Sequence, residues 1–504
     1  MNPNWQNITD PIFQWATQRP QAPAIIQPPE TLSYGELATL VGKAAVYLDG
    51  IGIRQGDRVA INLTNSIDHF ILTLALLRLG ATTIEMPYNT RTAPRSDALS
   101  RFEVRALFIE PVAAPVAGIR TIKIDAGWRG LIAQAEGDCR SGDDGDRVFA
   151  IMLTSGTTGE PKGSVIGHRE LFRRANAYTE LLASAGVFAG EAPAKFLLAA
   201  SIGFGTFFQR TMAHFVLGGA IVILPEFLHV VDLVKAIGAW DDAYCYVPAA
   251  VCSVLISAAP ATGFLYPRLR ALVAGAGFLH PQEKLAMLTR VCPNFHHSYG
   301  ASGIGSIAVL GPHEARERPD SVGRPPSSVE VEVVDEYERP VPPGAIGQLR
   351  CRSREGGGFA AEDDRNNGER FRDGWYYPGD RARIDQAGYI FLQGRSSDAI
   401  RRAGSEFFPV EIEAVMAEHS SVAEVAVVGV PGPLREDEIV ALVVPRGRAE
   451  HDALAAHCRS RLHPERRPDR VYYADALPKT AAGKLDRVRV RAIVMQQGSF
   501  QRGQ

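Results

Sequence analysis

The sequence predicts an α/β protein built on parallel sheets, with a smaller β-rich unit toward the carboxyl end. Short β-branched runs alternate with helical patterns through most of the 504 residues, and such alternation favours parallel sheets. Segments 329–334 and 346–352 instead look like short strands separated by Pro/Gly turns, with no long helix between them. At roughly 150 residues per domain, the length allows about three domains, or one large domain and a smaller one.

The first half of the chain shows the alternation most clearly. Residues 33–36, Ser-Tyr-Gly-Glu, have the form of a capping box, and apolar residues follow them at helical spacing. Segments 58–63 and 82–86 are predicted strands, with a buried helix predicted between them at 68–79. The same strand pattern recurs at 106–110, 149–154, 220–224 and 269–273.

The alternation resumes after Gly394. Pro409 is well placed as the first residue of a helix, because its fixed φ suits that position and its missing N–H costs nothing there. Strands are predicted at 422–430 and 438–445. Segment 355–367 is rich in Gly, Asp, Glu and Asn, and is predicted to be an exposed loop.

Composition and charge exclude several classes of protein. Lys+Arg number 54 and Asp+Glu 56, so the chain lacks the surplus of cations on which general nucleic-acid binding depends. The six cysteines form no CxxC pair and no zinc-type spacing with His, so we expect scattered, mostly buried thiols. No signal peptide is visible, and no apolar run reaches the ~18 residues that a spanning helix needs. We therefore expect a soluble cytoplasmic protein.

The strongest local motif is a segment rich in Gly, Thr and Ser at 153–163, directly after a predicted strand. Its glycines let the backbone approach a ligand closely, and its hydroxyls and successive N–H groups can surround an anion. It differs from the GxxxxGK[ST] loop, because no Lys follows the second Gly directly. We interpret it as a polyphosphate site, the alternative being a polar turn. The residues assigned to it are Thr154, Ser155, Gly156, Thr157, Thr158, Gly159 and Lys162.

Four further motifs follow in a fixed order. Segment 297–302 offers an aromatic ring and a hydroxyl, and 374–380 ends in a carboxylate able to accept both hydroxyls of a ribose. Segment 394–404, which precedes a Pro-Val-Glu-Ile-Glu run, and segment 478–487 complete the set. Together the five motifs resemble the adenylate-forming superfamily of acyl-CoA synthetases, adenylation domains and luciferases, and most of all an acid–CoA ligase. The resemblance covers nearly the whole chain.

The resemblance implies a two-domain fold. Residues 1–396 would form a large N-terminal domain, with doubly wound α/β subdomains and a small β-rich subdomain, that holds ATP and the acyl group. Residues 397–504 would form a small, mobile α+β lid carrying the catalytic lysine. Ser397 would be the hinge. Gly404 would line the channel for the thiol, the alternative being a plain turn glycine.

The implied chemistry has two steps. A carboxylate attacks the α-phosphorus of ATP, in the presence of Mg²⁺, to give acyl-AMP and pyrophosphate, and the thiol of CoA then displaces AMP. Because the first step joins two anions, cations must neutralise and position them. The implied partners are a small carboxylic acid and either CoA or an acyl carrier protein, with no nucleic acid, no membrane span, and a monomeric or homodimeric state.

The resemblance also assigns roles to single residues. Lys484 would bridge the α-phosphate and the substrate carboxylate, and only eight of the 54 cations are lysines, so a lysine is informative here. Its alternative is a solvated surface lysine. Asp380 would bind the ribose and Arg395 the ribose and phosphate, the alternatives being a turn-capping Asp and an inter-domain ion pair. Tyr299 would stack on adenine. The remaining nucleotide residues would be Gly275, Ala276, Gly300 and Ser302.

One position departs from the family pattern, and one segment bears on the substrate. Gly303 stands where the family usually has a magnesium-binding Glu, so Mg²⁺ is held by phosphates, hydroxyls and water, or by another carboxylate, or adenylation is weak. No Asp lies in segment 199–208, which disfavours an α-amino acid. The acyl pocket is assigned to Ile202, Phe204, Gly205, Ala276, Ala301 and Ile304.

These pocket residues are mostly apolar or small, which suits an aromatic or medium-length aliphatic acid. Ile202, Phe204 and Phe207 have an alternative role as ordinary core residues. Three functions therefore stand: an acid–CoA ligase, an acyl-AMP ligase that loads a carrier-protein pantetheine, and a degenerate nucleotide-binding homologue, which Gly303 motivates.

Overall fold

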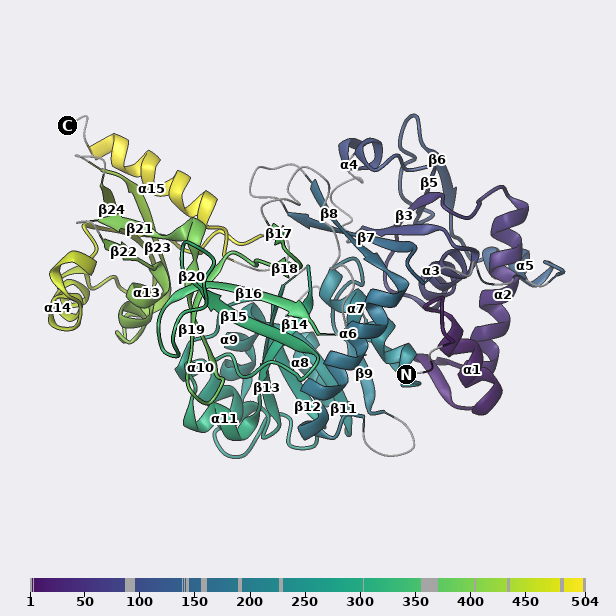
Figure 1. Ribbon diagram of the computed structural model, residues 1–504, viewed down its shortest axis with the longest axis horizontal. Coiled ribbons are helices and arrows are strands. Elements are labelled where there is room, and N and C mark those ends of the chain that lie inside the picture. The colour runs from purple at the N-terminus through teal and green to yellow at the C-terminus, as the bar shows by residue number, and fades with distance from the viewer. Residues whose placement is uncertain are drawn as a thin grey trace.

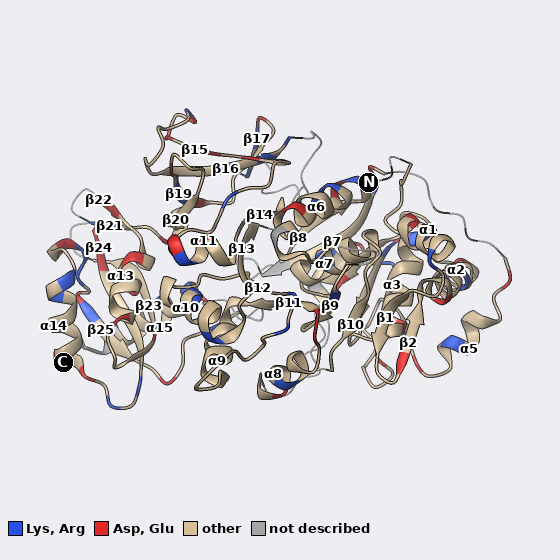
Figure 2. Ribbon diagram, turned by 90° about the horizontal axis from the view of Figure 1, so that it is seen from below, with Lys and Arg blue, Asp and Glu red and all other residues tan. Residues whose placement is uncertain are grey.

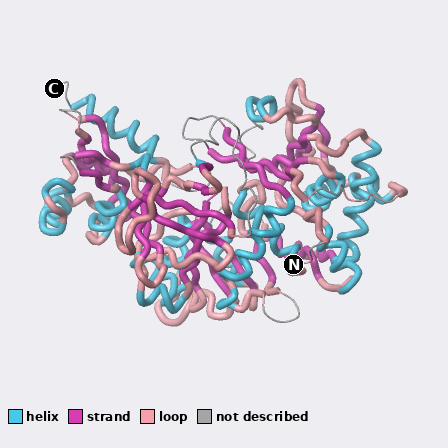
Figure 3. Tube along the Cα trace, in the orientation of Figure 1, coloured by secondary structure: helices cyan, strands magenta, loops and turns pink. Residues whose placement is uncertain are grey.

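The chain is described by a computed structural model covering residues 2, 4–86, 96–137, 139, 141, 145–155, 161–188, 193–225, 230–301, 303–354, 370–402, 405–432, 436–480 and 485–501. Two large sheets with their helices make up most of the molecule, a third sheet lies beside them, and the C-terminal elements form one end (Figures 1 and 3). Cations and anions are interspersed over these elements (Figure 2). No helix among the described residues is long and apolar enough to cross a membrane.

The first large sheet has six strands in the order β6-β5-β3-β4-β7-β8. All neighbours are parallel except β7 and β8, which form an antiparallel hairpin. Its strands are β3 (Arg58–Asn62), β4 (Thr82–Glu85), β5 (Ala106–Ile109), β6 (Arg120–Lys123), β7 (Val148–Ser155) and β8 (Pro161–Gly167). The helices before and among them are α1 (Asp10–Gln18), α2 (Tyr34–Gly50), α3 (Ile67–Leu79), α4 (Ser96–Arg101) and α5 (Trp128–Ala133).

The second large sheet has eight strands in the order β14-β13-β12-β11-β9-β10-β1-β2, parallel inside and antiparallel at both edges. Its strands are β1 (Pro23–Gln27), β2 (Glu30–Ser33), β9 (Lys195–Leu198), β10 (Ile221–Ile223), β11 (Ala243–Pro248), β12 (Ala271–Gly275), β13 (Phe295–Ala301) and β14 (Gly305–Leu310). The associated helices are α6 (His168–Leu181), η1 (Ala183–Ala185), α7 (Gly205–Val216), α8 (Val230–Gly238), α9 (Ala249–Ala258), α10 (Pro281–Ala286), η2 (Met287–Val291) and α11 (Pro312–Glu317).

One hydrophobic core joins the two large sheets. It contains Val59 of β3 and Phe149 of β7 from the first sheet, and Phe196 of β9 and Tyr244 of β11 from the second. Helix α3 is buried on nearly every face, as its continuous apolar sequence predicts. Because the two sheets share this core, the loops at the ends of their parallel strands are held in one packed unit.

The β-rich unit is a separate antiparallel sheet, as the sequence predicted. Its strands are β15 (Val329–Val334), β16 (Gly347–Ser353), β17 (Phe371–Arg372), β18 (Trp375–Tyr376), β19 (Asp380–Ile384) and β20 (Ile390–Arg395). The predicted loop at 355–367 lies outside the described residues.

The C-terminal unit has its own two hydrophobic clusters. It comprises η3 (Ser396–Asp398), the hairpin β21 (Ile400–Arg402) and β22 (Ser405–Phe407), α13 (Pro409–Ala417), a sheet of β23 (Val422–Pro431), β24 (Asp437–Pro445) and β25 (Arg470–Tyr473), α14 (His451–Arg461), η5 (Pro464–Arg466) and α15 (Arg487–Gln501). In Figure 1 these elements lie beyond β19 and β20, at the far end from α1 and α2.

Local sequence signals located several elements accurately. Ser33 and Glu36 form the predicted capping box at the start of α2, and Pro409 is the first residue of α13. The strand predicted at 269–273 lies two residues later, because its pairing with β11 begins at Ala271. Five cysteines are buried and Cys139 is partly buried.

Candidate nucleotide and acyl site

Three of the predicted nucleotide residues lie together where the second large sheet meets the β-rich sheet. The Tyr299 hydroxyl, from β13, donates to Asp380 Oδ2 at 2.5 Å. Arg395 pairs with Asp380 across the β19–β20 ladder, with its Nε 3.7 Å from Oδ1. Burial raises the pKa of Tyr299 well above its usual value, and the Asp380 charge adds to this shift. An aromatic ring, a carboxylate and a guanidinium are thus grouped, as recognition of a nucleoside and its phosphate requires.

The backbone beside this group is tightly packed. Gly275, the last residue of β12, pairs with Ser298 of β13, and a Cβ there would lie 2.7 Å from both the Ser298 carbonyl oxygen and the Tyr246 hydroxyl. The next residue, Ala276, has φ 56°, a left-handed conformation uncommon for a residue with a side chain. A Cβ at Gly300 would meet the Gly305 carbonyl. The glycines therefore permit close approach of strands β12, β13 and β14.

The proposed phosphate loop joins β7 to β8. Thr154 and Lys162 are paired in this hairpin, and Ser155 ends β7. A Cβ at Gly163 would lie 2.7 Å from the Ile151 side chain and 2.8 Å from the Phe102 ring, so this glycine is required by packing. The side chains of Thr154, Ser155 and Lys162 lie outside the described residues, as do Gly156, Thr157, Thr158, Gly159, Ser302, Gly404 and Lys484.

The predicted acyl residues fall into two groups. Ile202 is fully buried in the core joining the two sheets, and Phe204 packs against that core directly before Gly205, the first residue of α7. Ala301 and Ile304 form a turn after β13, in which the Ile304 N–H donates to the Ala301 carbonyl at 3.2 Å. Ile202 is thus packed in the core, and the assignment of these residues to an acyl pocket stays a prediction.

Family models match both parts of this chain. An AMP-binding enzyme model matches residues 12–356, and an AMP-binding enzyme C-terminal domain model matches residues 411–484. The chain belongs to the AMP-binding enzyme family. The predicted resemblance to adenylate-forming enzymes is therefore confirmed, and so is the α/β fold with a large N-terminal part and a small C-terminal part.

Several curated AMP-binding enzymes are similar over nearly their full length. A fatty acid–[acyl-carrier-protein] ligase of Streptomyces coeruleorubidus is 30% identical, with 97% of each chain covered. A 2-succinylbenzoate–CoA ligase of Bacillus licheniformis is 27% identical, covering 96% of this chain and 98% of the relative. A 4-hydroxybutyrate–CoA ligase of Metallosphaera sedula is 25% identical, covering 91% and 84%.

Solved structures share the fold. The o-succinylbenzoate CoA synthetase of Bacillus subtilis, in complex with its acyl-adenylate intermediate, gives a TM-score of 0.83 at 21% identity and covers 96% of this chain and 98% of its own. ATP-bound MatB of Rhodopseudomonas palustris gives 0.86 at 22% identity, covering 97% and 98%.

The position where this family usually carries a magnesium-binding Glu is filled differently here. A Cβ at Gly303 would overlap the ring of Tyr376, which comes from the motif at 374–380 and is buried. No group of three potential metal-ligating side chains occurs among the described residues. Asp380, the carboxylate beside Tyr299, is engaged by Tyr299 and Arg395. The described side chains therefore do not by themselves form a magnesium site.

Sequence reasoning missed Arg174, which ties the turn after β13 to two helices. This buried arginine of α6 donates to Glu170 Oε1 at 2.8 Å, to Gln209 Oε1 of α7 at 2.7 Å and to the Gly303 carbonyl at 3.1 Å. It thereby fixes the turn carrying Ile304. Nothing local in the sequence distinguishes Arg174 from a surface cation on an amphipathic helix.

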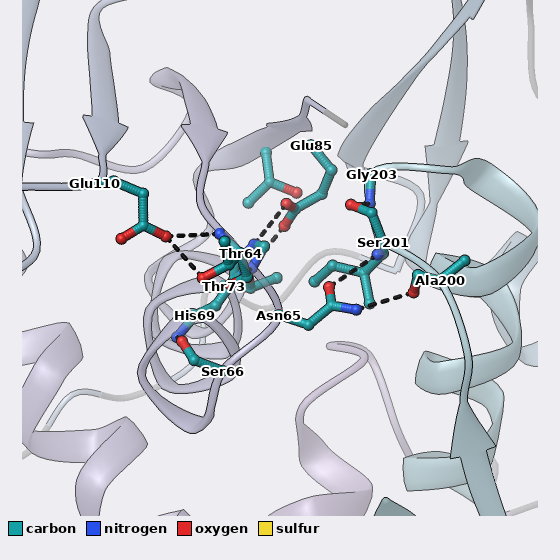
Figure 4. Close-up of polar contacts among 12 residues, drawn as sticks. Thr64, Asn65, Ser66, His69, Thr73, Glu85, Glu110, Ala200, Ser201 and Gly203 are labelled. Atoms are coloured by element: carbon teal, nitrogen blue, oxygen red, sulfur yellow. Dashed lines mark hydrogen bonds and ion pairs between the residues drawn. The ribbon is translucent and has the colours of Figure 1, made fainter. Parts of the chain in front are cut away.

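Sequence reasoning also missed Asn65, whose side chain joins the loop before α3 to the segment before α7 (Figure 4). Its Nδ2 donates to the Ala200 carbonyl at 2.9 Å, and its Oδ1 accepts from the Ile202 N–H at 3.1 Å. One amide thus satisfies two backbone groups of the segment that carries the predicted acyl residues. This bridge connects the two large sheets at the candidate site.

A polar network, partly buried at Thr64 and Glu110 and buried at His69 and Glu85, holds the loop that carries Asn65 (Figure 4). Thr64 donates through its backbone N–H and its hydroxyl to Glu110 Oε1, at 2.7 and 2.8 Å. His69 Nε2 lies 2.9 Å from Glu85 Oε2, and the Thr73 hydroxyl donates to Glu85 Oε1 at 2.8 Å. Because such bonds are strong in a low-dielectric interior, the network gives Asn65 a rigid base.

The predicted hinge lies in η3, between the β-rich sheet and the C-terminal unit. The Ser397 hydroxyl donates to Asp398 Oδ1 at 3.2 Å, and Arg487 Nε lies 3.4 Å from Asp398 Oδ2. Arg487 also makes a bidentate pair with Glu413 of α13, at 2.6 and 2.8 Å. The segment before the hinge packs against the C-terminal unit, since a Cβ at Gly394 would lie 2.8 Å from the Phe408 ring.

Proposed function

We propose that this chain is an AMP-forming acid–thiol ligase. It activates a carboxylic acid with ATP to acyl-AMP and then transfers the acyl group to the thiol of CoA. The observation that carries this proposal is the grouping of Tyr299, Asp380 and Arg395 in a chain whose family match extends over both the large and the small unit. The CoA ligases among its relatives support the choice of thiol.

The chain's residues would divide the chemistry as follows. Asp380 holds the ribose hydroxyls, Tyr299 lies against adenine, and Arg395, whose side chain is more than half exposed, reaches ribose and phosphate. Lys484 brings the substrate carboxylate and the α-phosphate together by neutralising both. Mg²⁺ would arrive bound to the ATP phosphates and supply charge neutralisation there. The β7–β8 loop would hold the phosphates through Thr154, Ser155, Gly156, Thr157, Thr158, Gly159 and Lys162.

We further propose a division into residues 1–396 and a lid of 397–504 that rotates about Ser397. Rotation would withdraw Lys484 after adenylation and bring Gly404 to the thiol. The position of η3 between two separate sheets supports a hinge there. We place the enzyme in the cytoplasm, as a monomer or homodimer.

The decisive experiment measures pyrophosphate exchange and acyl-CoA formation with ATP, CoA and a panel of aromatic and aliphatic acids. Lys484→Ala is expected to lower exchange by roughly 10²–10³-fold, because it removes the charge between two anions. Acyl transfer from supplied acyl-AMP should survive. Lys479→Ala is the matched control, since Lys479 lies in the same motif but pairs with Glu424 at 2.8 Å. Equal loss of both half-reactions in Lys484→Ala would contradict its assigned role.

A second candidate is an acyl-AMP ligase that loads a carrier protein. The 30% identical relative named as an acyl-carrier-protein ligase favours it. Offering CoA and a pantetheinylated carrier protein side by side decides between the two, because acylation of only the carrier would exclude the CoA ligase. Acid-independent nucleotide binding with no exchange for any acid would instead indicate a degenerate homologue.

A further inference from the structure

A buried arginine lies on the face of α7 that packs against the second large sheet. Arg210 is 6% exposed and stands within the run Phe207 to Phe215, where nearly every residue is buried. Its Nη1 donates to the Tyr244 hydroxyl at 2.7 Å and its Nη2 to the Ser298 hydroxyl at 3.3 Å. The guanidinium carbon lies 4.1 Å from the ring centroid of Tyr246. Arg210 is therefore surrounded by phenols and a serine.

The charge of Arg210 has no anionic partner among the described residues. No carboxylate oxygen lies within 4.0 Å of its guanidinium in that part of the chain. Burial raises the pKa of Tyr246 to about 12 and that of Tyr244 well above its usual value, so both phenols are neutral near pH 7. Hydroxyls and aromatic faces stabilise a cation only in part, and an unpaired buried charge is costly.

On the neighbouring helix α6, a buried arginine is paired with a carboxylate. Arg174 of α6 is buried to a similar extent, and Glu170, one turn earlier on the same helix, pairs with it at 2.8 Å. The position one turn before Arg210 is Thr206, and the positions that follow it on α7 are also uncharged. The fold thus pairs one arginine internally and leaves the other with spare N–H donors.

Arg210 contacts residues that adjoin the proposed nucleotide residues. Ser298, which it contacts, precedes Tyr299 on β13, and the Tyr246 hydroxyl lies against Gly275 at the end of β12. Both strand ends carry proposed nucleotide residues, and α7 begins at the proposed acyl residue Gly205. The buried hydroxyl of Tyr178, whose ring centroid lies 4.8 Å from the guanidinium, makes no well-formed hydrogen bond with the described residues.

We propose that Arg210 binds a second carboxylate on the acid, so that the substrate is a dicarboxylic acid. One carboxylate reacts with ATP beside Tyr299, and the other pairs with the guanidinium, with the Tyr178 hydroxyl as an additional donor. Arginine suits this task because its planar fork binds a carboxylate through two parallel hydrogen bonds. This inference rests on the proposed ligase function and narrows its substrate class, which the apolar residues alone left as a simple aromatic or aliphatic acid.

The test compares matched acids that differ only at the far end. Pyrophosphate exchange is measured for glutarate against pentanoate and for terephthalate against 4-methylbenzoate. The wild-type protein is expected to favour the diacid of at least one pair by tenfold or more in kcat/KM. Arg210→Met should reverse that preference while leaving the KM for ATP unchanged, and Arg210→Lys should retain part of it, because a point charge replaces the fork.

Each outcome bears on a separate claim. A wild-type preference for the methyl-ended acid of both pairs overturns the proposal while leaving the ligase function intact. An unchanged diacid preference in Arg210→Met also overturns it. If none of the acids supports pyrophosphate exchange, the proposed ligase function itself is contradicted. If Arg210→Met fails to fold, the wild-type comparison and Arg210→Lys still decide, since neither requires removal of the buried charge.

Discussion

At Gly303 the chain has no side chain where the family usually carries a magnesium-binding Glu, yet no empty space results. The space that a side chain would need is filled by the ring of Tyr376, which packs in the same hydrophobic cluster as Ile304. A carboxylate at position 303 would therefore require the motif at 374–380 to move. The glycine at 303 and the buried ring of Tyr376 are therefore coupled by packing.

Replacing Gly303 by Ala should lower the free energy of unfolding by about 1–3 kcal/mol, because the new methyl group overpacks a rigid ring. Gly42→Ala is the matched control. Gly42 lies within α2, and a Cβ there would have no other atom within 4 Å, so this change should stabilise the protein by about 0.5–1 kcal/mol. Denaturant unfolding measures both. If Gly303→Ala leaves the free energy of unfolding unchanged, the Tyr376 ring can move aside at little cost, and the prediction is wrong.

Some residue roles could be predicted from the sequence and others could not. Tyr299 and Asp380 stand in short motifs whose chemistry is visible locally, and the structure brings them into contact. Arg174, Asn65 and Arg210 act through partners on distant segments, so no local pattern reveals them. A charged residue inside the apolar run of α7 was the one available signal for Arg210.

At the scale of elements, the loop before α3 and the segment before α7 act as one unit through Asn65. The predicted strands and helices could be placed from periodicity, caps and Pro409, because these depend on neighbouring residues. The bridge between two such elements depends on tertiary packing instead. Asn65 supplies a donor to the Ala200 carbonyl and an acceptor to the Ile202 N–H, both in the segment before α7.

Asn65→Ala should lower kcat/KM for the acid by roughly tenfold or more, because the segment carrying Ile202 and Phe204 loses the amide that positions it, at about 1–3 kcal/mol for the groups left unpaired. The KM for ATP should change little. Asn65→Asp keeps the acceptor for the Ile202 N–H and should retain part of the activity. Steady-state kinetics with varied acid and varied ATP separates these effects. An equal rise of both KM values would indicate general destabilisation rather than positioning.

At the scale of the whole molecule, Arg487 joins the last motif to the rest of the C-terminal unit and to the hinge. Burial lowers the pKa of its guanidinium, but the Glu413 and Asp398 charges outweigh this, so the pKa is raised overall and the charge is retained. Glu413 is 5% exposed and depends on this pair. The segment carrying Lys484 therefore ends at a fixed point beside η3.

Arg487→Met should destabilise the C-terminal unit by about 3–5 kcal/mol, because it leaves the Glu413 carboxylate buried without its partner. Arg489→Met is the control, since Arg489 is exposed and pairs with Asp486 at 3.3 Å, an arrangement worth about 0–1 kcal/mol. Denaturant unfolding, with proteolysis to locate the opened region, measures both changes. Equal stability losses in the two variants would contradict the proposed importance of the buried pair.

The first strand of the chain has a consequence for how the protein is made. Ile25 of β1 pairs with Ile221 of β10, although about two hundred residues separate them. During synthesis β1 can pair with β2 as soon as both are made, but its other edge stays unpaired until β10 has followed. One edge of the β1–β2 hairpin is thus exposed until β10 is made, so a chaperone that shields this edge would favour correct assembly.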